Sequence, residues 1–329
     1  MNSPRRVPLT MAAIAAVVVT LAACAPEPQE SASPSPRPLA TAAPEPTPTG
    51  PVAAFGGDCS AAVDTAAVTA AMGEAMSFWE PAWEDGADAE LGGLRCGWTS
   101  DQYLSGFATV WVYPVAVLDP TYVSGEESNS CQTADPICMA SEVFGGTWVG
   151  VQAYSNTAAT QIERLRPLLA DIGERVAESA PPVPGPRQGW WLPVATCEEL
   201  AASLTTDGFP STSTDDRPAT GPVFVDGPRS RGCSLNMEIE GEERGVTLLL
   251  DAGAGRGVEA VLTRDPSQRI DFEGRTFANA PEQYPLDGNP GLIIGSDGVN
   301  LVSVLRSDGD GQAALDAPIL AALLKALDG

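Results

Sequence analysis

Two tryptophans and several carboxylates come together in one short segment, Trp79-Glu80-Pro81-Ala82-Trp83-Glu84-Asp85. Indole rings have flat faces on which a cationic group or a sugar can rest. Trp79 and Trp83 therefore indicate one wall of a ligand-binding cleft. The alternative is a loop whose tryptophans cover a sheet while its acids face water, and we favour this second interpretation.

Other acidic segments give a weaker indication of a metal or catalytic site. The run Asp308-Gly309-Asp310-Gly311 has part of a calcium-loop pattern but lacks the further acid and the bidentate glutamate that an EF-hand requires. Its acids are better placed to stabilise the N-terminus of the following helix. Adjacent acids such as Glu126-Glu127 could support acid–base chemistry, but a chain with 43 Asp and Glu residues contains such pairs by chance. We predict no metal site.

The chain contains no histidine. This excludes Ser-His-Asp and Cys-His catalysis, histidine-ligated zinc or copper, and the common histidine pH switch. The sequence also lacks a Walker A loop, a G-x-S-x-G turn and a G-x-G-x-x-G loop after a strand. We therefore expect no catalytic residues and no cofactor.

The N-terminal segment has the order of a bacterial export signal. Arg5-Arg6 form a charged start, an apolar run extends from Met11 to Ala22, and small residues lead into Cys24. The run is too short to span a bilayer comfortably, which takes about 20 residues. Leu21-Ala22-Ala23-Cys24 resembles the lipobox of bacterial lipoproteins. The resemblance implies cleavage before Cys24 and acylation of its thiol; the alternative is an ordinary secretory peptide.

These features predict a lipid-anchored protein on the outer face of the cytoplasmic membrane, extending into the cell wall. Residues 25–51 are rich in Pro, Ser, Thr and Ala and predict an extended spacer, about 80 Å long at ~3.1 Å per residue. The net charge of −25 is spread along the chain and repels nucleic acid and anionic headgroups. The bilayer is therefore contacted through acylated Cys24 and not through a basic patch.

The rest of the chain divides into two similar halves on either side of a Pro-rich break. Val151 and Val302 each lie 16 residues before a proline, Pro167 and Pro318, and apolar residues spaced for one helix face follow both prolines. We predict a duplicated domain. The predicted organisation is a signal peptide (1–23), a lipidated cysteine and spacer (24–52), a first repeat (53–179), a linker (180–189) and a second repeat (190–329).

Each repeat has the pattern of a helix, several antiparallel strands and a final helix, which predicts class α+β. Asp58 is suited to cap the first helix, and Thr196-Cys197-Glu198-Glu199 has the spacing of a capping box. Asp297-Gly298 lies between two apolar runs and predicts a hairpin.

Seven cysteines divide into Cys24 and six others. Outside the cytoplasm an even set predicts disulfides. Thiolate metal binding at Cys131 and Cys138 is the alternative, but no second pair lies nearby and we do not expect it. The duplication selects one connectivity from the many possible, which pairs Cys59 with Cys96, Cys197 with Cys233, and Cys131 with Cys138.

The early cysteine Cys59 on an Ala-rich helix and the later Arg95-Cys96-Gly97-Trp98 add a family resemblance to the lipobox and spacer. Together they resemble secreted actinobacterial lipoproteins of domain-of-unknown-function families. They are distantly similar to extracellular sensor domains of mycobacterial-type serine/threonine kinases. In the second half Cys233-Ser234-Leu235 departs from the Cys-x-Trp pattern. The resemblance implies fold class and location and carries no catalytic residues.

We therefore predict a non-enzymatic lipoprotein that binds an envelope ligand or an extracellular protein partner. The alternative is a carboxylate-based hydrolase of cell-wall glycans, which needs two carboxyl groups about 5–10 Å apart across a cleft. A third possibility is an acidic spacer domain with a purely structural role.

Overall fold

The computed structural model describes residues 50–79, 85–100, 106–125, 129–131, 137–155, 162–218, 221–239, 241–280, 292–306 and 313–327. The chain divides into two compact units, Met1–Pro46 and Thr47–Gly329, and every described residue belongs to the second. The predictions for Cys24, Trp83, Glu126-Glu127 and 308–311 lie outside the described residues. Among the helices described, none is long and apolar enough to cross a membrane.

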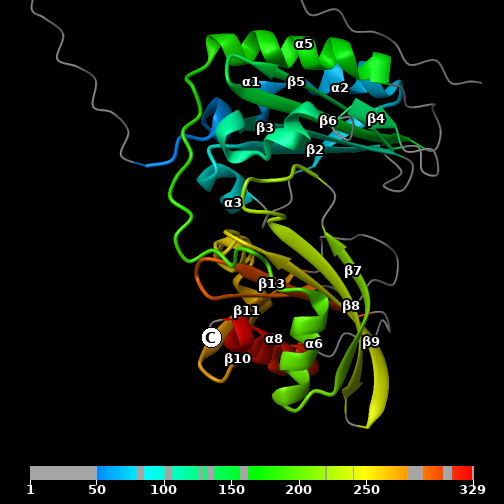
Figure 1. Ribbon diagram of the computed structural model, residues 1–329, viewed down its shortest axis with the longest axis vertical. Helices are drawn as coiled ribbons and strands as arrows, with labels where there is room; N and C mark the ends of the chain where they lie inside the picture. The colour runs from blue at the N-terminus through cyan, green and yellow to red at the C-terminus, as the bar shows by residue number, and fades with distance from the viewer. Residues whose placement is uncertain are drawn as a thin grey trace, which may run out of the picture. The chain divides into compact units, whose positions relative to one another are not determined.

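The first repeat is an antiparallel sheet with α1, α2 and α5 packed on one face (Figure 1). Helix α5 runs along this face and packs on β5 and β6. Its helices are α1 (Cys59–Ala62), α2 (Thr65–Met72), α3 (Asp85–Glu90), α4 (Pro120–Ser124) and α5 (Ile162–Glu178). Its strands are β1 (Met76–Trp79), β2 (Leu94–Ser100), β3 (Gly106–Pro114), β4 (Ser130–Cys131), β5 (Ile137–Phe144) and β6 (Thr147–Ser155).

The second repeat is a seven-stranded antiparallel sheet, and its first and last helices pack on each other. Its helices are α6 (Cys197–Thr206), α7 (Gly257–Arg264) and α8 (Ala313–Leu327). Its strands are β7 (Ser211–Pro218), β8 (Ser230–Ile239), β9 (Glu242–Asp251), β10 (Arg269–Phe272), β11 (Arg275–Ala280), β12 (Leu292–Ser296) and β13 (Leu301–Arg306).

The two sheets share one topology. The first has the order β1-β2-β3-β6-β5-β4, and the second has the order β7-β8-β9-β13-β12-β11 with β10 added at its edge. After Pro266 the second repeat contains a segment that forms β10 and β11. In the strand order, β11 takes the position that β4 has in the first sheet. The predicted fold class, α+β with two tandem disulfide-stabilised repeats, is confirmed.

Strand register gives the residue correspondence between the repeats. Cys96 lies opposite Val110, which lies opposite Val151. Cys233 lies opposite Leu248, which lies opposite Val304. The sequence spacing to the prolines instead paired Val151 with Val302, two residues away. Val304 lies 14 residues before Pro318, whereas Val151 lies 16 residues before Pro167, so equal spacing to a proline does not identify equivalent residues.

The final helices also begin earlier than their prolines suggest. Pro167 lies inside α5, which is described from Ile162, and Pro318 lies inside α8, which is described from Ala313. Proline near the start of a helix removes few backbone hydrogen bonds. The prolines therefore mark the beginning of each helix without defining its first residue.

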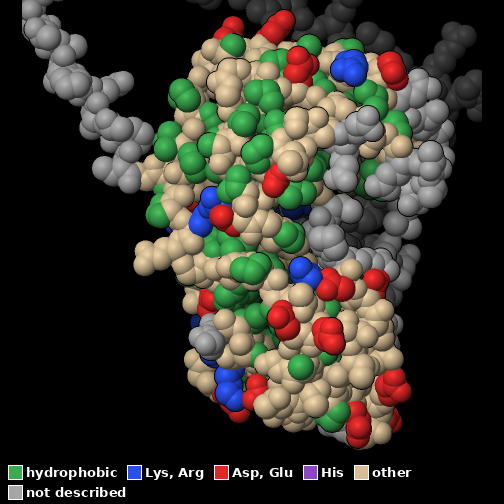
Figure 2. Space-filling model, in the orientation of Figure 1, with side chains coloured by type: hydrophobic (Ala, Val, Ile, Leu, Met, Phe, Trp, Pro, Cys, Tyr) green, Lys and Arg blue, Asp and Glu red, His purple; other side chains and the backbone are tan. Residues whose placement is uncertain are grey.

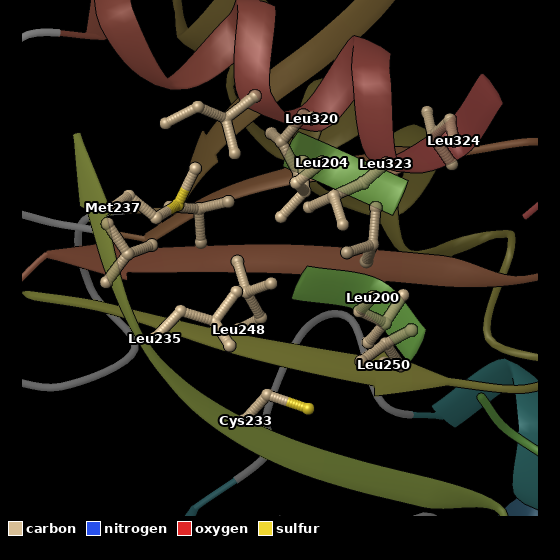
Figure 3. Packing of buried hydrophobic residues seen from close by; sticks show 14 of the residues in the cluster. Leu200, Leu204, Cys233, Leu235, Met237, Leu248, Leu250, Leu320, Leu323 and Leu324 are labelled. Carbon is tan, nitrogen blue, oxygen red and sulfur yellow. The ribbon is translucent and has the colours of Figure 1, made fainter. Parts of the chain in front are cut away.

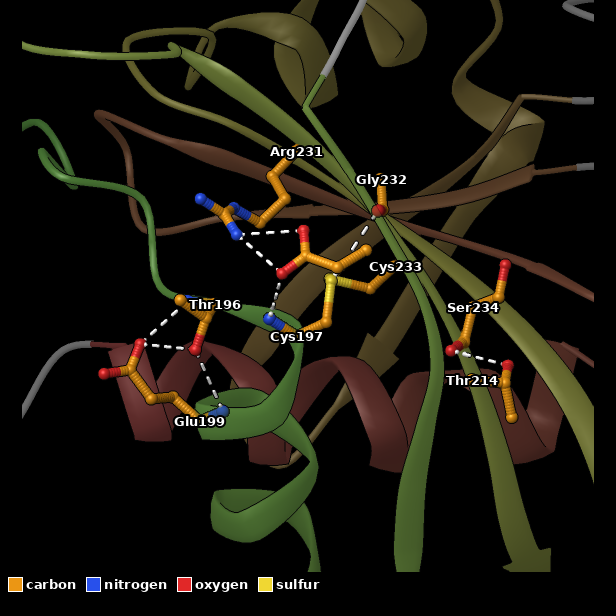
Figure 4. The surroundings of a disulfide bond; sticks show 9 residues. Thr196, Cys197, Glu199, Thr214, Arg231, Gly232, Cys233 and Ser234 are labelled. Atoms are coloured by element: carbon orange, nitrogen blue, oxygen red, sulfur yellow. Dashed lines mark hydrogen bonds and ion pairs between the residues drawn. A yellow bond between two sulfur atoms is a disulfide. The ribbon is translucent and has the colours of Figure 1, made fainter.

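Both predicted helix caps are confirmed. The Asp58 carboxylate accepts hydrogen bonds from the Ser60 N–H and hydroxyl at 2.8 and 2.7 Å. The Glu199 N–H donates to the Thr196 hydroxyl at 3.2 Å, and the Thr196 N–H donates to the Glu199 carboxylate at 2.8 Å (Figure 4). These contacts satisfy N–H groups that a helix start leaves without partners.

The three predicted disulfides are confirmed, with Cα–Cα distances of 5.7 Å for Cys59–Cys96, 4.0 Å for Cys131–Cys138 and 5.4 Å for Cys197–Cys233. Each long bridge joins the first residue of the opening helix to the second strand of its sheet. The long disulfide therefore joins the opening helix to the sheet at the same position in both repeats.

The core of the second repeat lies between its sheet and the helices α6 and α8 (Figure 3). Leucines from both helices meet alternate residues of β8 and β9, which is the pattern expected of one buried sheet face. The labelled residues are Leu200, Leu204, Cys233, Leu235, Met237, Leu248, Leu250, Leu320, Leu323 and Leu324.

The repeats pack together within their compact unit. Ala87 of α3 is buried among Val258, Ala278 and other residues of the second repeat. Phe224 is buried beside Tyr113 of the first sheet, with the two rings edge to face at a centroid distance of 5.3 Å. Trp190 packs against both this cluster and the core of the second repeat.

Asn300 attaches the end of the linker to the second repeat. Its side-chain oxygen accepts the N–H groups of Trp191 and Gly253 at 3.0 and 3.2 Å. Its amide donates to the Gly189 carbonyl and to Asp297 at 2.8 and 2.9 Å. The predicted Asp297-Gly298 hairpin, which joins β12 to β13, thus also orders the linker.

Candidate functional site

One face of the first sheet lies under α1, α2 and α5. The opposite face carries α4, whose Tyr122 ring lies 5.8 Å from that of Trp148. Cys96, Val110 and Val151 lie on the face under α1, α2 and α5 and are buried. Side chains alternate between the two faces along a strand. The residues beside these three therefore point to the opposite face, which we call the outer face.

Part of the outer face is covered. Trp111, Tyr113 and Trp148 are buried there with Leu118 and with Phe224 from the second repeat. Within the remainder, seven residues that the strand register places in neighbouring positions form what we call the aromatic face. They are Trp79, Gly97, Thr99, Phe107, Thr109, Gln152 and Tyr154.

Three aromatic side chains shape the aromatic face. Phe107 of β3 lies opposite Tyr154 of β6, and their rings stack with a centroid distance of 5.4 Å and an interplanar angle of 18°. Trp79 lies opposite Gly97, and a Cβ on Gly97 would be 3.1 Å from its ring atom Cε3. The Trp79 indole therefore packs directly on the backbone of Gly97, which has no side chain. All three aromatic side chains are half-buried and keep part of their surface exposed.

Polar side chains lie beside these rings. Thr109 lies opposite Gln152 in the middle of the face, and Thr99 lies opposite Phe107. Among the described residues, none is hydrogen-bonded to the Gln152 amide or to the Thr109 hydroxyl. A glutamine amide offers two donors and an acceptor, and a threonine hydroxyl offers one donor and an acceptor. The aromatic face therefore combines flat apolar rings with available hydrogen-bonding groups.

The Trp79 indole packs on the sheet, as the structural interpretation expected. The role of Trp79 in ligand binding stays a prediction. Sequence reasoning missed Phe107, Thr109, Gln152 and Tyr154. Alternate positions in 106–114 and 147–155 carry aromatic or polar residues, and this period of two was the available signal.

A buried charge cluster lies at the other end of the outer face and joins the repeats. The Asp88 carboxylate accepts hydrogen bonds from the Arg229 guanidinium, at 2.7 Å, and from the Tyr113 hydroxyl. The side chains of Asp88 and Arg229 are 4% and 11% exposed. Burial raises the pKa of Asp251, and Ser230 and Arg229 oppose this rise. Burial and the Asp88 charge also raise the pKa of Tyr113 well above its usual value.

In the described part of the chain, no group of three or more Cys, Asp or Glu side chains could hold a metal ion. The Arg229 guanidinium already occupies the position of a counter-ion to Asp88. The cluster therefore neutralises charge with the protein's own groups and joins two distant parts of the chain.

Acidic side chains are scattered over the visible face of the second repeat and do not form one patch (Figure 2). The aromatic face differs from this surface because none of its seven residues is charged. Because it combines uncharged residues with partly exposed aromatic rings, we take the aromatic face as the candidate site.

No protein-family model matches the chain, and no curated protein matches it. Among solved structures, the chain is matched to the crystal structure of DynU16, a protein of the dynemicin biosynthetic locus. The identity is 12%, the match covers 77% of this chain and 96% of that chain, and the TM-score is 0.12. A TM-score at this level supports no conclusion about fold or function.

Proposed function

We propose that the chain is a lipid-anchored lipoprotein that binds an envelope ligand without catalysis. The observation that carries the binding function is the aromatic face. Half-buried aromatic rings and unpartnered polar groups on a rigid sheet are typical of a binding surface. The stacking of Phe107 on Tyr154 supports a binding surface that is preformed in the absence of ligand.

The anchor and the location rest on the lipobox resemblance at Leu21–Cys24. The three disulfides fit an oxidising compartment outside the cytoplasm. In a bacterial host, Cys24→Ala should abolish incorporation of labelled palmitate and release the protein from the membrane fraction. Unchanged membrane retention and labelling of the Cys24→Ala variant would contradict the anchor.

Binding is tested on the compact unit, residues 47–329, with its disulfides intact. The protein is exposed to an extract of the bacterial envelope and examined by native mass spectrometry. The proposal expects a defined added mass. Absence of any added mass across extracts of both lipid and glycan fractions contradicts it.

A carboxylate hydrolase is the second candidate, and the Asp88–Asp251 pair favours it. Both carboxyl groups interact with Arg229, and burial raises the pKa of Asp251, as a general acid would require. Both residues are, however, buried between the repeats. The test is release of reducing ends from cell-wall glycans. Activity that Asp88→Asn and Asp251→Asn both abolish, with folding preserved, would establish hydrolysis in place of binding.

A further inference from the structure

We propose that the aromatic face of the first repeat binds a neutral glycan, at one site per chain. This inference rests on the proposed binding function and specifies its ligand. It draws on the geometry of the face, its lack of charge and its absence from the second repeat.

The geometry suits sugar rings. A pyranose has a face of C–H groups that packs on an aromatic ring and a rim of hydroxyl groups that require hydrogen bonds. Phe107 and Tyr154 stack on each other with an interplanar angle of 18°, and both side chains keep part of their surface exposed, which leaves the outer side of the stack for a sugar ring. Trp79 supplies a third ring on the same face, held over Gly97.

The polar groups suit the hydroxyl rim. Thr109 and Gln152 lie in the same cross-strand row as Trp79 and Gly97, and they are the next residues on this face of β3 and β6 after Phe107 and Tyr154. Neither is hydrogen-bonded to a described residue. An acyl chain would cover both groups without satisfying them, which is unfavourable. A lipid tail is therefore a poor occupant.

The lack of charge on the aromatic face disfavours ionic ligands. The protein contains 43 Asp and Glu residues, yet none of the seven residues of the aromatic face is acidic or basic. Arg95, on the same side of β2, acts electrostatically on Tyr113 and Asp251 of the buried charge cluster. A cationic ligand would lack a carboxylate on this face, and an anionic ligand would lack a cation of its own. An uncharged polyhydroxylated ligand fits both conditions.

The second repeat lacks the equivalent surface. Register places Gly245 at the position of Phe107, Leu305 at that of Gln152 and Asp215 at that of Trp79. Thr247 corresponds to Thr109. These positions provide no aromatic ring, so the duplicated sheet supports the structure while the first sheet binds.

The experiment uses residues 47–329 and neutral oligosaccharides of glucose, mannose, galactose and arabinose as probes, with binding measured by native mass spectrometry and calorimetry. We expect one oligosaccharide per chain for at least one probe. Phe107→Ala and Tyr154→Ala should each weaken that binding at least tenfold. Tyr154→Phe keeps the ring and should lose less affinity than Tyr154→Ala.

Matched controls lie in the second repeat. Thr247→Ala and Leu305→Ala should leave affinity unchanged, whereas Thr109→Ala and Gln152→Ala should weaken it. Circular dichroism and peptide mapping without reduction verify that each variant keeps its fold and disulfides.

The possible failures are distinguishable. If no neutral oligosaccharide binds but an envelope component still adds mass, the glycan inference is overturned and the binding function stands. If two oligosaccharides bind per chain, or binding survives both alanine variants, the assignment to the aromatic face is overturned. If neither probes nor extract bind, the proposed function fails as well.

Discussion

The ring of Phe107 stacks on the ring of Tyr154 across β3 and β6, with a centroid distance of 5.4 Å and an interplanar angle of 18°. The two residues are 47 positions apart in the chain, and strand register alone brings them together. A cross-strand aromatic pair of this kind also stabilises the sheet, by roughly 0.2–1 kcal/mol. The same contact therefore contributes to folding and orders part of the proposed binding surface.

Gly97 is required for the position of the Trp79 indole. A Cβ at residue 97 would lie 3.1 Å from both Cε3 and the carbonyl oxygen of Trp79. We expect Gly97→Ala to shift the indole, change the tryptophan emission spectrum and weaken ligand binding about tenfold, or ~1.4 kcal/mol. Ser234→Ala, at the equivalent position of the second repeat, is the control. Unchanged emission and unchanged affinity in Gly97→Ala would refute this role.

The Asp88–Arg229 ion pair should be costly to break. Asp88→Ala leaves a buried guanidinium without its partner, and we expect a loss of about 3–5 kcal/mol in the free energy of unfolding. The double variant Asp88→Leu with Arg229→Met should recover part of this loss, because no buried charge remains. Recovery is partial because the Tyr113 hydroxyl loses its acceptor. Urea unfolding at constant pH measures all three proteins, and additive losses in the double variant would contradict the coupling.

Asp251 should make stability depend on pH. Burial raises its folded-state pKa, so the folded protein binds a proton that the unfolded chain has released. Stability from this group therefore falls as pH rises from about 3.9, the unfolded value, through the folded pKa. The groups that face it are Arg229, Arg95, Asp88 and Ser230.

Asp251→Asn removes this titration. We expect the variant to be more stable than the parent at pH 7, with a difference that shrinks on acidification and vanishes near pH ~4. Urea midpoints measured across this range provide the test. A difference that does not change with pH would show that Asp251 titrates normally.

The two long disulfides should contribute equally to stability. Cys59–Cys96 and Cys197–Cys233 close loops of 37 and 36 residues at equivalent points of the two sheets. Replacing either pair by serine should cost about 3–4 kcal/mol in the chain-entropy model, and replacing Cys131–Cys138 about 2 kcal/mol. Denaturant unfolding of the three double-serine variants measures each cost. A larger loss for the short bridge than for a long one would reject loop closure as the main contribution.

Local patterns in the sequence predicted much of the fold. The helix starts at Asp58 and Thr196 were predictable because capping depends on residues only two or three positions apart. The disulfides followed from similar cysteine spacings in two copies. Register could not be read with the same accuracy, and alignment on the prolines was displaced by two residues at Val304.

The aromatic face and the buried charge cluster were harder to predict from the sequence. Trp79 stood out because tryptophan is rare and lies beside acids, whereas Phe107 and Tyr154 are ordinary strand residues until register pairs them. Asp88 and Arg229 are 141 positions apart and carry no local signal of contact. Such contacts arise from packing between distant elements, on which periodicity along the chain carries no information.

The central claim is that the outer face of the first sheet captures a ligand. The most direct measurement is native mass spectrometry of residues 47–329 after exposure to an envelope extract, with Phe107→Ala/Tyr154→Ala and Thr247→Ala/Leu305→Ala proteins measured in parallel. We predict one added mass per chain on the parent and on the second-repeat variant, and none on the first-repeat variant. An added mass that persists without Phe107 and Tyr154, or its absence from the parent, would contradict the claim.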